Sequence, residues 1–450
     1  MKKPKPFDTP RVAFFTLGCK VNQFETACLA EKFKALGWET VSFKEEAELY
    51  LINSCAVTAE AQRQSAQMVR QAARNHPDSL IAASGCACQL FPETFQKIRG
   101  VDVISGTFTK MDLPDLFGDR KKEEGPRILL QEGTKRPLAP QFPLPGGKTR
   151  AFLRIQDGCN GSCSYCLVPK ARGGSRSLPE KEVLEGIKFF SAKGVKELVL
   201  TGIHLGQYGA DLHPEGHLVS LLAKALSSHP ELSIRLSSLE PQEISPDFLD
   251  LFEIYSNLCP HLHIPLQSGD DGILKKMNRT YSSEYYAELI HTIHKKIPLA
   301  SIGADVIVGF PGEGEGDFLR TLNFISDLPM SYLHIFPFSP RPGTPAANFP
   351  DQINRKVMEE RLKILKDLTI KKQQAFIGCC LNREFSALCL QEAGENGWSK
   401  VLTENYLTVS IQNRLEKNER TRVVLLSFDR GEIKGAIAGS PEIMDTLPPT

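Results

Sequence analysis

The sequence has 450 residues, of which 41% are hydrophobic and 24% charged, with a formal net charge of +1. These values are close to the averages of soluble globular proteins and exclude a fibrous repeat or a disordered chain. The length predicts about two to four domains. A net charge so near zero gives no general electrostatic case for nucleic-acid binding, so any RNA site must be a local patch.

The N-terminal segment is basic but contains no apolar run long enough for a signal peptide. No later stretch approaches the ~18 consecutive apolar residues of a membrane-spanning helix. We therefore expect a cytoplasmic protein that makes no contact with a membrane. In a reducing compartment, the 12 cysteines are expected to bind metals or to take part in catalysis rather than to form disulfides.

Four short apolar runs in the N-terminal part predict buried strands at residues 12–15, 50–52, 80–83 and 101–104. Helix-length stretches lie between them, among them residues 22–36 and 58–74. This alternation predicts a parallel, doubly wound sheet, and hence an α/β domain over residues 10–118.

Residues 119–144 have the composition of a linker, with a charged run at 120–124 followed by several prolines.

Strand-like runs recur in the central part, at residues 152–155, 197–200, 233–236, 262–264, 304–308 and 333–336. Their starts are about 30 to 45 residues apart with amphipathic stretches between them, as in βα units. Residues 145–373 are therefore predicted to form a partial (βα)6 barrel with its active site at the carboxyl ends of the strands.

Short alternating runs at residues 384–389, 407–411 and 422–426 follow, separated by turn signals at 395–397 and 429–431. Residues 374–445 are predicted to form a small antiparallel β-barrel, similar in kind to folds that hold single-stranded RNA.

A CxxxCxxC motif formed by Cys159, Cys163 and Cys166 follows directly after the first predicted barrel strand. Three thiolates at this spacing can hold three irons of a cubane iron-sulfur cluster and leave the fourth iron open to another ligand. A zinc site would need a fourth protein ligand, and none lies at the usual spacing.

Cys19, Cys55 and Cys86 each come shortly after a predicted strand of the N-terminal sheet. In a parallel sheet those positions share the carboxyl edge, so the three thiols are expected to converge on a second cluster. The alternative is that they are small buried apolar residues. Cys88 is either a bystander or a substitute ligand, and the other cysteines have no matching placement.

The CxxxCxxC motif with Tyr165 before its last cysteine resembles the cluster loop of the radical S-adenosylmethionine (SAM) superfamily. The resemblance implies a 4Fe-4S cluster on the motif, SAM bound to its open iron, and Tyr165 packed on the adenine. Thr201 and Gly202 lie where that superfamily places a loop against the methionine amino group. A plain strand-to-helix turn explains them equally well.

Further motifs extend the resemblance to the methylthiotransferase family, including TLGCKVNQ at 16–23, NSCAVT at 53–58, HIPLQSG at 263–269 and DVIVGFPGE at 305–313. In that family an auxiliary 4Fe-4S cluster would be held by Cys19, Cys55 and Cys86, and residues 374–445 would be a TRAM domain. The loops LGCKVNQFET and NSCAVT resemble those of the threonylcarbamoyladenosine tRNA enzymes.

Ser238 and Glu240 follow the third barrel strand and are candidates for binding the SAM ribose, because a hydroxyl and a carboxylate can accept both diol hydrogens. A surface carboxylate is the alternative for Glu240. No side chain beyond the cluster ligands is assigned a catalytic role.

Two groups of basic residues have simpler interpretations. Arg63, Arg70 and Arg74 share one predicted helix and are more readily explained as a solvated face than as phosphate ligands. His261 and His263 flank a strand and are interpreted as satisfied histidines.

The predicted function is 2-methylthiolation of N6-threonylcarbamoyladenosine at position 37 of tRNA, with two 4Fe-4S clusters and SAM. The anticodon arm and a flavodoxin or ferredoxin are the expected partners of a monomer. The alternatives are the same chemistry on isopentenyladenosine or on a ribosomal protein. A noncatalytic iron-sulfur or zinc RNA-binding protein is the alternative of another class.

Overall fold

The computed structural model describes residues 9–117, 125–132, 137–144, 146, 149–394 and 397–440. Parts of the predicted linker (119–124 and 133–136), two residues of a predicted turn (395 and 396) and the end of the predicted C-terminal barrel (441–445) lie outside these ranges. Contacts divide the chain into two units. The first comprises Met1–Gly146, Arg154–Leu178 and Ser339–Asn348, and the second comprises Gly147–Leu153, Pro179–Phe338 and Phe349–Thr450.

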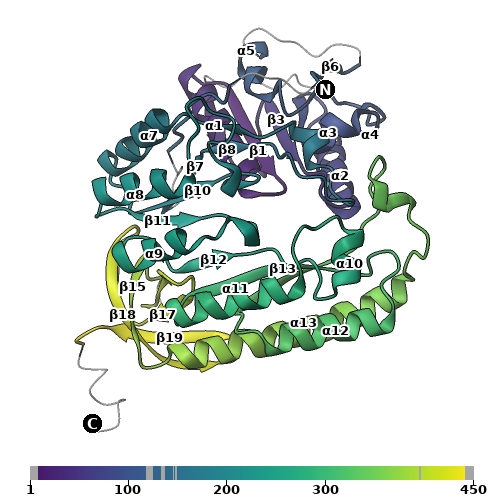
Figure 1. Ribbon diagram of the computed structural model, residues 1–450. Coiled ribbons are helices and arrows are strands. Elements are labelled where there is room, and N and C mark those ends of the chain that lie inside the picture. Colours follow the sequence, from purple (N-terminus) through teal and green to yellow (C-terminus); the bar gives the residue numbers. More distant parts are fainter. Residues whose placement is uncertain are drawn as a thin grey trace. The chain divides into compact units, whose positions relative to one another are not determined.

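A six-stranded parallel sheet forms the centre of the first unit (Figure 1). In spatial order its strands are β2 (Glu39–Val41), β1 (Arg11–Thr16), β3 (Leu49–Ser54), β4 (Leu80–Gly85), β5 (Val103–Ser105) and β6 (Arg127–Leu129). The order reverses between β1 and β3, which is the topological switch point where ligands collect in such sheets.

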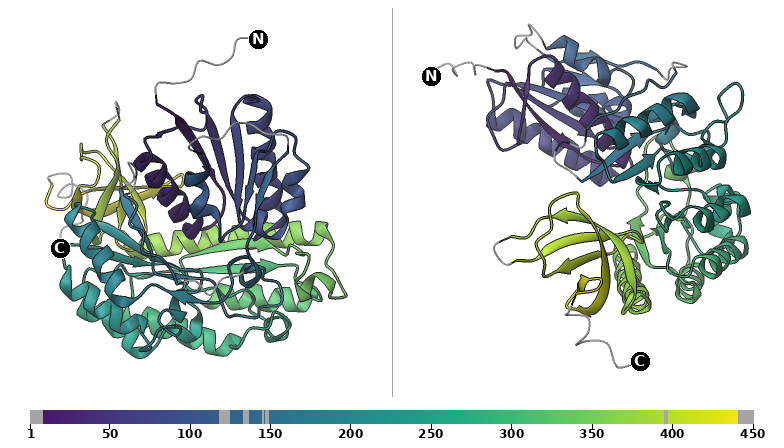
Figure 2. Two further views of the ribbon diagram at one scale, coloured as in Figure 1. Left: turned by 90° about the horizontal axis from the view of Figure 1, so that it is seen from above. Right: turned by 90° about the vertical axis from the view of Figure 1, so that its left-hand side faces the viewer.

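The two faces of this sheet carry separate apolar cores. Val12, Leu49 and Leu51 pack with α1 (Lys20–Ala35) and α5 (Leu113–Leu116) on one face. Their chain neighbours pack on the other face with α2 (Ala59–Asn75), α3 (Cys86–Leu90) and α4 (Pro92–Gln96). Strand side chains alternate between faces, so continuous apolar runs mark strands that are covered on both sides. Figure 2 shows helices on both sides of the sheet.

A small hairpin-like pair, β8 (Gln156–Asp157) with β9 (Arg176–Ser177), completes the described core of the first unit. Between its strands lie the cysteine motif and the short helix α6 (Val168–Arg172).

The second unit contains the partial barrel. Its strands run in the order β7 (Arg150–Arg154), β10 (Glu197–Thr201), β11 (Ser233–Leu236), β12 (His261–His263), β13 (Ser301–Val308) and β14 (Tyr332–Pro337). They form two three-stranded sheets, and the parallel bridge Ile234–Leu258 lies next to the junction of β11 and β12. The predicted partial (βα)6 barrel is confirmed.

Helices connect and cover these strands. They are α7 (Glu180–Ala192), α8 (Leu218–Ser228), α9 (Pro246–Ile254), α10 (Asp271–Lys276), α11 (Ser283–Lys296), α12 (Glu315–Asp327) and the long α13 (Arg355–Cys380).

The C-terminal residues form a closed five-stranded barrel, which is confirmed by the structure and visible in yellow in Figure 2. Its order is β15 (Glu384–Gln391), β16 (Ser399–Thr403), β17 (Thr408–Ile411), β19 (Glu432–Ile437) and β18 (Arg420–Asp429). All pairs are antiparallel except β17 with β19, which is parallel. Closure leaves no exposed sheet edge in this part.

Several strands carry no apolar run that marks them in the sequence, among them β2, β6, β16 and β19 and the two-residue strands β8 and β9. β2 and β6 are the edge strands of the first sheet, where one side of the strand faces no neighbour, and Ile128 of β6 is 42% exposed. β6 lies in the segment that was expected to be a linker. Edge strands bury little side-chain surface, so their sequences resemble those of loops.

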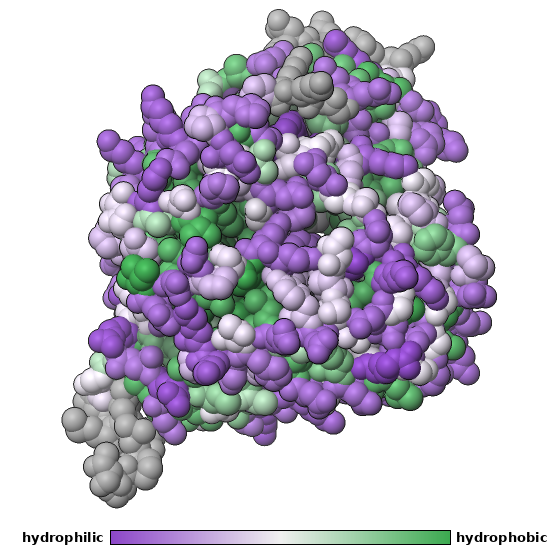
Figure 3. Space-filling view, viewed as in Figure 1, coloured by the Kyte–Doolittle hydropathy of each residue, from purple (hydrophilic) through white to green (hydrophobic). Residues whose placement is uncertain are grey.

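Hydrophilic residues predominate on the face shown in Figure 3, with apolar residues interspersed among them. Among the described residues, no helix combines the length and the apolar character needed to cross a membrane.

Candidate functional site

The first cysteine group lies at the carboxyl edge of the six-stranded sheet. Cys19 is the N-cap of α1, Cys55 follows β3 directly, and Cys86 is the first residue of α3 after β4. Gly18 has a positive φ of 102°, and a Cβ atom there would lie 3.0 Å from the sulfur of Cys55. Glycine at this position therefore lets the loop after β1 approach Cys55 closely.

The three thiols of this group interact electrostatically. Burial, with smaller contributions from the neighbouring Cys86 and Cys19, raises the pKa of Cys55 to about 11. The pKa of Cys86 is also raised by burial, while Arg172 and Lys110 act against the rise. The structure thus brings Cys19, Cys55 and Cys86 together, although no local motif joins them.

Cys88 is packed in the apolar core on one face of the sheet. Burial raises the pKa of its thiol to about 12, and its sulfur lies 3.5 Å from the Ser54 hydroxyl. This environment favours the bystander interpretation of Cys88 over the role of a substitute ligand.

The second cysteine group lies in the loop between β8 and α6. Its three residues are partly buried. The backbone N–H of Gly161 donates to the Cys159 sulfur at 3.2 Å, and that of Val168 donates to the Cys166 sulfur at 3.4 Å. Such N–H donors stabilise negative charge on sulfur and raise the reduction potential of a cluster bound there.

Gly158 fixes the start of this loop. It has a positive φ of 77°, and a Cβ atom there would lie 2.1 Å from the carbonyl oxygen of Gly174. Only glycine fits this conformation and this close approach.

A buried ionic network in the first unit connects the helices that follow the two cysteine groups. Arg172 of α6 donates to both carboxylate oxygens of Glu25 on α1, at 3.0 and 3.1 Å. It also donates to Asn22 at 2.6 Å and to Asp157 at 3.0 Å. The amine of Lys110 donates to Glu25 at 2.5 Å.

The network carries an excess of positive charge. Among the described residues, four cations, Arg154, Arg172, Arg176 and Lys110, pair with two carboxylates, Glu25 and Asp157. Burial alone would raise the pKa of Glu25, but the cations outweigh this effect and hold that pKa well below its usual range. Burial raises the pKa of Cys86, and Arg172 and Lys110 act against that rise, in the direction of the thiolate form that binds metal.

Sequence reasoning did not identify this network. Its residues come from separate segments of the chain, with Glu25 and Arg172 147 positions apart. The only local signal is the position of Asp157 and Arg172 just outside the cysteine motif.

The donor atoms in both groups fit iron-sulfur clusters. Each group offers three soft thiol ligands, in one case at the edge of a rigid sheet and in the other on a loop with backbone N–H donors to sulfur. Three ligands per group leave one iron of a cubane without a protein ligand.

The predicted SAM contacts fall in both units. Tyr165 is partly buried in the cysteine loop of the first unit. Thr201 ends β10 in the second unit, and its buried hydroxyl has no hydrogen-bond partner within the part of the chain that the structure describes. The N–H of Gly202 lies 3.4 Å from the Ser237 hydroxyl. An unpaired buried hydroxyl at the carboxyl end of a barrel strand fits a ligand contact.

Ser238 and Glu240 differ in their surroundings. Ser238 is exposed, whereas Glu240 is partly buried and forms an ion pair with Arg279. The backbone N–H of Glu240 donates to Glu243 at 2.8 Å. The ion pair occupies one face of the Glu240 carboxylate, so Ser238 is the more accessible of the two ribose-binding candidates.

His263 is part of a polar cluster on the face of the barrel sheet. Its Nε2 lies 3.0 Å from the carboxylate of Asp305, and Nδ1 of His334 lies 3.4 Å from the same oxygen. The hydroxyl of Tyr332 lies 2.8 Å from His261 and 3.3 Å from His263. His261 and His263 thus have hydrogen-bond partners, as the interpretation of satisfied histidines requires.

The three arginines on α2 have different environments. Arg63 forms an ion pair with Glu60 at 2.6 Å, while Arg70 and Arg74 line a surface pocket with residues that follow α4.

Two family descriptions match the chain. The Radical SAM superfamily matches residues 153–325, and the uncharacterized protein family UPF0004 matches residues 11–106. The first match contains the CxxxCxxC motif, and the second contains Cys19, Cys55 and Cys86.

A solved structure shows a similar fold. The radical S-adenosylmethionine methyltransferase TsrM from Kitasatospora setae, with cobalamin and a [4Fe-4S] cluster bound, aligns with a TM-score of 0.56 at 13% identity. The alignment covers 75% of this chain and 77% of TsrM.

Curated relatives match over nearly the full length. The threonylcarbamoyladenosine tRNA methylthiotransferase MtaB of Aquifex aeolicus is 37% identical over 92% of this chain and 100% of its own length. The corresponding protein of Bacillus subtilis is 36% identical over 88% of this chain and 89% of its own. A tRNA-2-methylthio-N(6)-dimethylallyladenosine synthase of Moorella thermoacetica is 33% identical over 81% and 84%. The chain belongs to the radical SAM tRNA methylthiotransferase family.

Proposed function

We propose that this protein converts N6-threonylcarbamoyladenosine at position 37 of tRNA to its 2-methylthio derivative. The observation that carries the proposal is the alignment with the Aquifex aeolicus threonylcarbamoyladenosine enzyme over that protein's entire length. The cysteine loops LGCKVNQFET and NSCAVT support the same substrate. Related proteins named for dimethylallyladenosine are 33–34% identical, so the same chemistry on isopentenyladenosine is the second candidate.

We propose that Cys159, Cys163 and Cys166 hold one 4Fe-4S cluster and that Cys19, Cys55 and Cys86 hold the other. When bound, the first cluster with SAM would supply a carbon-centred radical, and the second would carry the sulfur to be transferred. A radical is needed because the hydrogen on C2 of the adenine is not acidic enough for any side-chain base at neutral pH.

The chain's own residues have positioning roles in this proposal. Tyr165 would pack against the SAM adenine, Thr201 and Gly202 would contact its methionine part, and Ser238 would bind the ribose. Glu240 is held by Arg279, so its part would be to shape the loop after β11. Arg172 and Lys110 would stabilise the thiolates of the auxiliary group.

The anticodon arm of tRNA and a small electron carrier, such as a flavodoxin or ferredoxin, are the proposed partners. The closed C-terminal barrel and the first unit would bind the RNA. We propose that the protein acts as a monomer.

The test is nucleoside mass spectrometry of tRNA from a strain that lacks this protein and any paralogue. We expect 2-methylthio-N6-threonylcarbamoyladenosine to disappear and to return with the wild-type gene but not with Cys159→Ala. In vitro, tRNA carrying threonylcarbamoyladenosine should be modified in preference to tRNA carrying isopentenyladenosine. Persistence of the nucleoside in the deletion strain would contradict the substrate assignment.

Metal analysis separates the enzyme from a noncatalytic RNA-binding protein. Two loaded clusters give about eight irons per chain. Zinc in place of iron, without SAM cleavage, would support the binding protein.

A further inference from the structure

Four basic side chains surround a hollow on the first unit, which has a volume of about 680 Å³. They are Arg70 and Arg74 on α2, and Lys97 and Arg99 on the turn after α4. None of the described residues that line the hollow is acidic. We call it the basic pocket.

The charges of the basic pocket are not neutralised within the protein. All four side chains belong to exposed residues, and among the described residues none of them has an ion-pair or hydrogen-bond partner. Arg63, on the same helix, is by contrast paired with Glu60. On a chain with a net charge of +1, this is a local concentration of positive charge.

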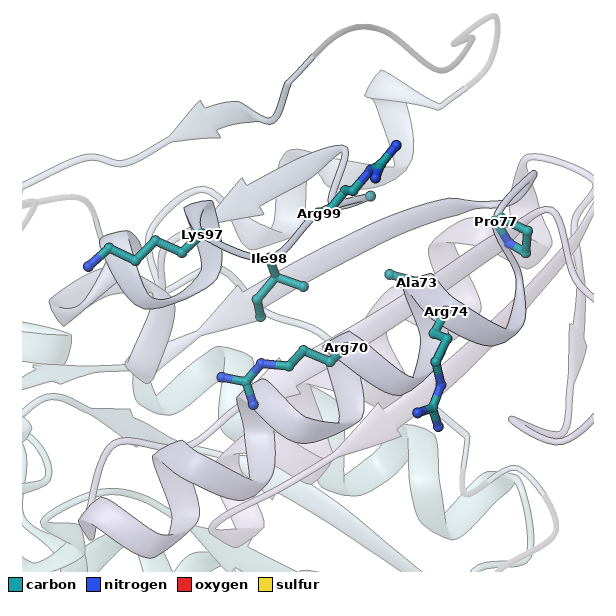
Figure 4. Close-up of a pocket in the computed structure, with 8 residues that line it drawn as sticks. Arg70, Ala73, Arg74, Pro77, Lys97, Ile98 and Arg99 are labelled. Atoms are coloured by element: carbon teal, nitrogen blue, oxygen red, sulfur yellow. The ribbon is translucent and has the colours of Figure 1, made fainter.

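The pocket is built on a close contact between α2 and the turn. Gly100 has a positive φ of 91°, and a Cβ atom there would lie 3.3 Å from the Cβ of Ala73. Figure 4 shows Ile98 directed toward α2, with the four charged ends extending around this apolar centre in different directions. Such an arrangement suits several phosphates along a backbone better than one small anion.

The position of the pocket restricts its partner. Cys55 lies a few residues before the first turn of α2, whereas Arg70 and Arg74 lie in its last two turns. Arg70 and Arg74 lie 11 and 15 residues beyond Ala59, the first residue of the helix, which is roughly 17 to 23 Å along its axis at 1.5 Å per residue. A partner bound at the pocket while its reacting group is near Cys55 must therefore extend over roughly this distance.

An RNA duplex meets this requirement. A stem that continues from a loop held near the cysteines presents phosphates at a regular spacing along its length. Arginine binds phosphate with a planar fork and lysine binds it as a point charge, and the pocket offers both.

We propose that the basic pocket binds backbone phosphates of the anticodon stem, on the side of the tRNA beyond the loop that carries the reacting adenosine. This inference rests on the proposed function in that it takes tRNA as the substrate. It adds a second contact region for tRNA, separate from the sheet edge that carries Cys19, Cys55 and Cys86. This region would contribute to tRNA affinity and not to the chemical step.

The test measures the Kd of the cluster-loaded protein for a tRNA transcript over a series of salt concentrations. We expect R70A/R74A to bind about tenfold more weakly near physiological salt, with the slope of log K against log salt reduced by roughly one per lost phosphate contact. R70K/R74K keeps the charges and should bind nearly as tightly as wild type. A single-stranded RNA that carries only the anticodon-loop sequence lacks the stem, so wild type and all variants should bind it with the same Kd.

Two controls address folding and net charge. K97A/R99A removes the other two charges of the basic pocket, which lie on a turn and not on a helix. This variant should therefore reproduce the loss of tRNA affinity without a change in the stability of α2. K363A/K366A removes two exposed charges from α13 and should leave the Kd unchanged. Cluster absorbance and circular dichroism confirm that each variant is folded.

An unchanged tRNA Kd for both R70A/R74A and K97A/R99A overturns the proposal. So does a loss that R70K/R74K shares, because that would indicate a structural role for the arginine side chains. Slower reduction by flavodoxin with unchanged tRNA binding would assign the pocket to an acidic protein instead. If mass spectrometry finds a different 2-methylthio nucleoside while the pocket variants bind tRNA weakly, the substrate assignment fails and this inference stands.

Discussion

Arg172 donates hydrogen bonds to both carboxylate oxygens of Glu25, at 3.0 and 3.1 Å, with both side chains only 2% exposed. Glu25 lies on the helix that follows Cys19, and Arg172 ends the short helix that follows Cys166. A single bidentate ion pair thus joins the two segments that carry cysteine ligands. Because the pair is buried, removing Arg172 takes two hydrogen bonds from Glu25 in a place where water does not replace them.

The Arg172→Met substitution tests this relationship. Breaking a buried ion pair from one side typically costs about 3 kcal/mol, and Lys110 still contacts Glu25 and limits the loss. We expect a lower urea midpoint of the cluster-loaded protein and a lower iron content. Arg63→Ala, which removes an exposed ion pair, is the matched control and should leave both unchanged. Equal midpoints for wild type and R172M would show that the pair does not stabilise this region.

The assignment of the cysteines to two clusters predicts a specific pattern of iron loss. Serine in place of Cys19, Cys55 or Cys86 should remove one cluster, which is about four of eight irons, and leave the other intact. Serine in place of a CxxxCxxC cysteine should remove the other cluster. Cys88→Ser is the control, because its buried thiol packs in the apolar core.

Iron analysis and electron paramagnetic resonance of the reduced variants measure this pattern. Full iron content in C86S together with loss of iron in C88S would reverse the assignment of these two residues.

Glycine at position 158 is predicted to be essential for the shape of the cysteine loop. An alanine Cβ would approach the Gly174 carbonyl to 2.1 Å, in addition to adopting an unfavourable positive φ. Gly37 has a similar φ of 85° but open space around it, so Gly37→Ala reports the cost of the φ angle alone, about 1 kcal/mol. We expect G158A to lower the melting temperature more than G37A and to lose iron at the CxxxCxxC group. Similar melting temperatures and full iron in both variants would show that the loop can move aside.

The buried pair of Glu197 and Arg235 predicts a dependence of stability on pH. Two nitrogens of Arg235 donate to the Glu197 carboxylate at 2.9 Å, and a third donates to the Glu404 carbonyl of the C-terminal barrel at 2.9 Å. Burial alone would raise the pKa of Glu197, but Arg235 and Arg150 outweigh it and hold that pKa below its usual range. The folded-state pKa is therefore lower than the unfolded-state value of about 4.3. The stabilisation is complete above that value and is lost as the pH falls through the folded-state pKa.

Comparison with Glu197→Gln measures this contribution. At pH 7 the wild type should be more stable than E197Q by about 3 kcal/mol, because the variant leaves Arg235 buried without its counter-charge. The difference between their urea midpoints should shrink as the pH is lowered below about 4. Loss of clusters in acid affects both proteins and cancels in the difference. A constant difference from pH 7 to acid would contradict the role of the ionised carboxylate.

The central strands of the six-stranded sheet could be predicted from the sequence because helices cover both faces of the sheet. Residues 50–52 and 80–83 are continuous apolar runs, and the structure places them in the fully buried strands β3 and β4. β2 could not be predicted, since its residues are exposed or only partly buried at the edge of the sheet. The same holds for β6.

The candidate site likewise has a part that the sequence predicted and a part that it did not. The CxxxCxxC motif is local, so its spacing alone indicates three ligands for one cluster. Cys19, Cys55 and Cys86 could be grouped only through the predicted sheet, and their mutual electrostatic effects agree with that grouping. Arg172 and Lys110 could not be predicted as partners of Glu25, because no local sequence pattern around them indicates that contact.

The sequence by itself determined the chemistry of the ligands and the class of the fold, because thiol spacing and apolar periodicity are properties of short segments. Only the tertiary structure decided the charge around those ligands and the place of the basic pocket. Coulombic interactions depend on distance in space, and Glu25 meets Arg172 across 147 positions of the chain. Arg70 and Lys97 likewise share a pocket only because α2 and the turn after α4 pack together.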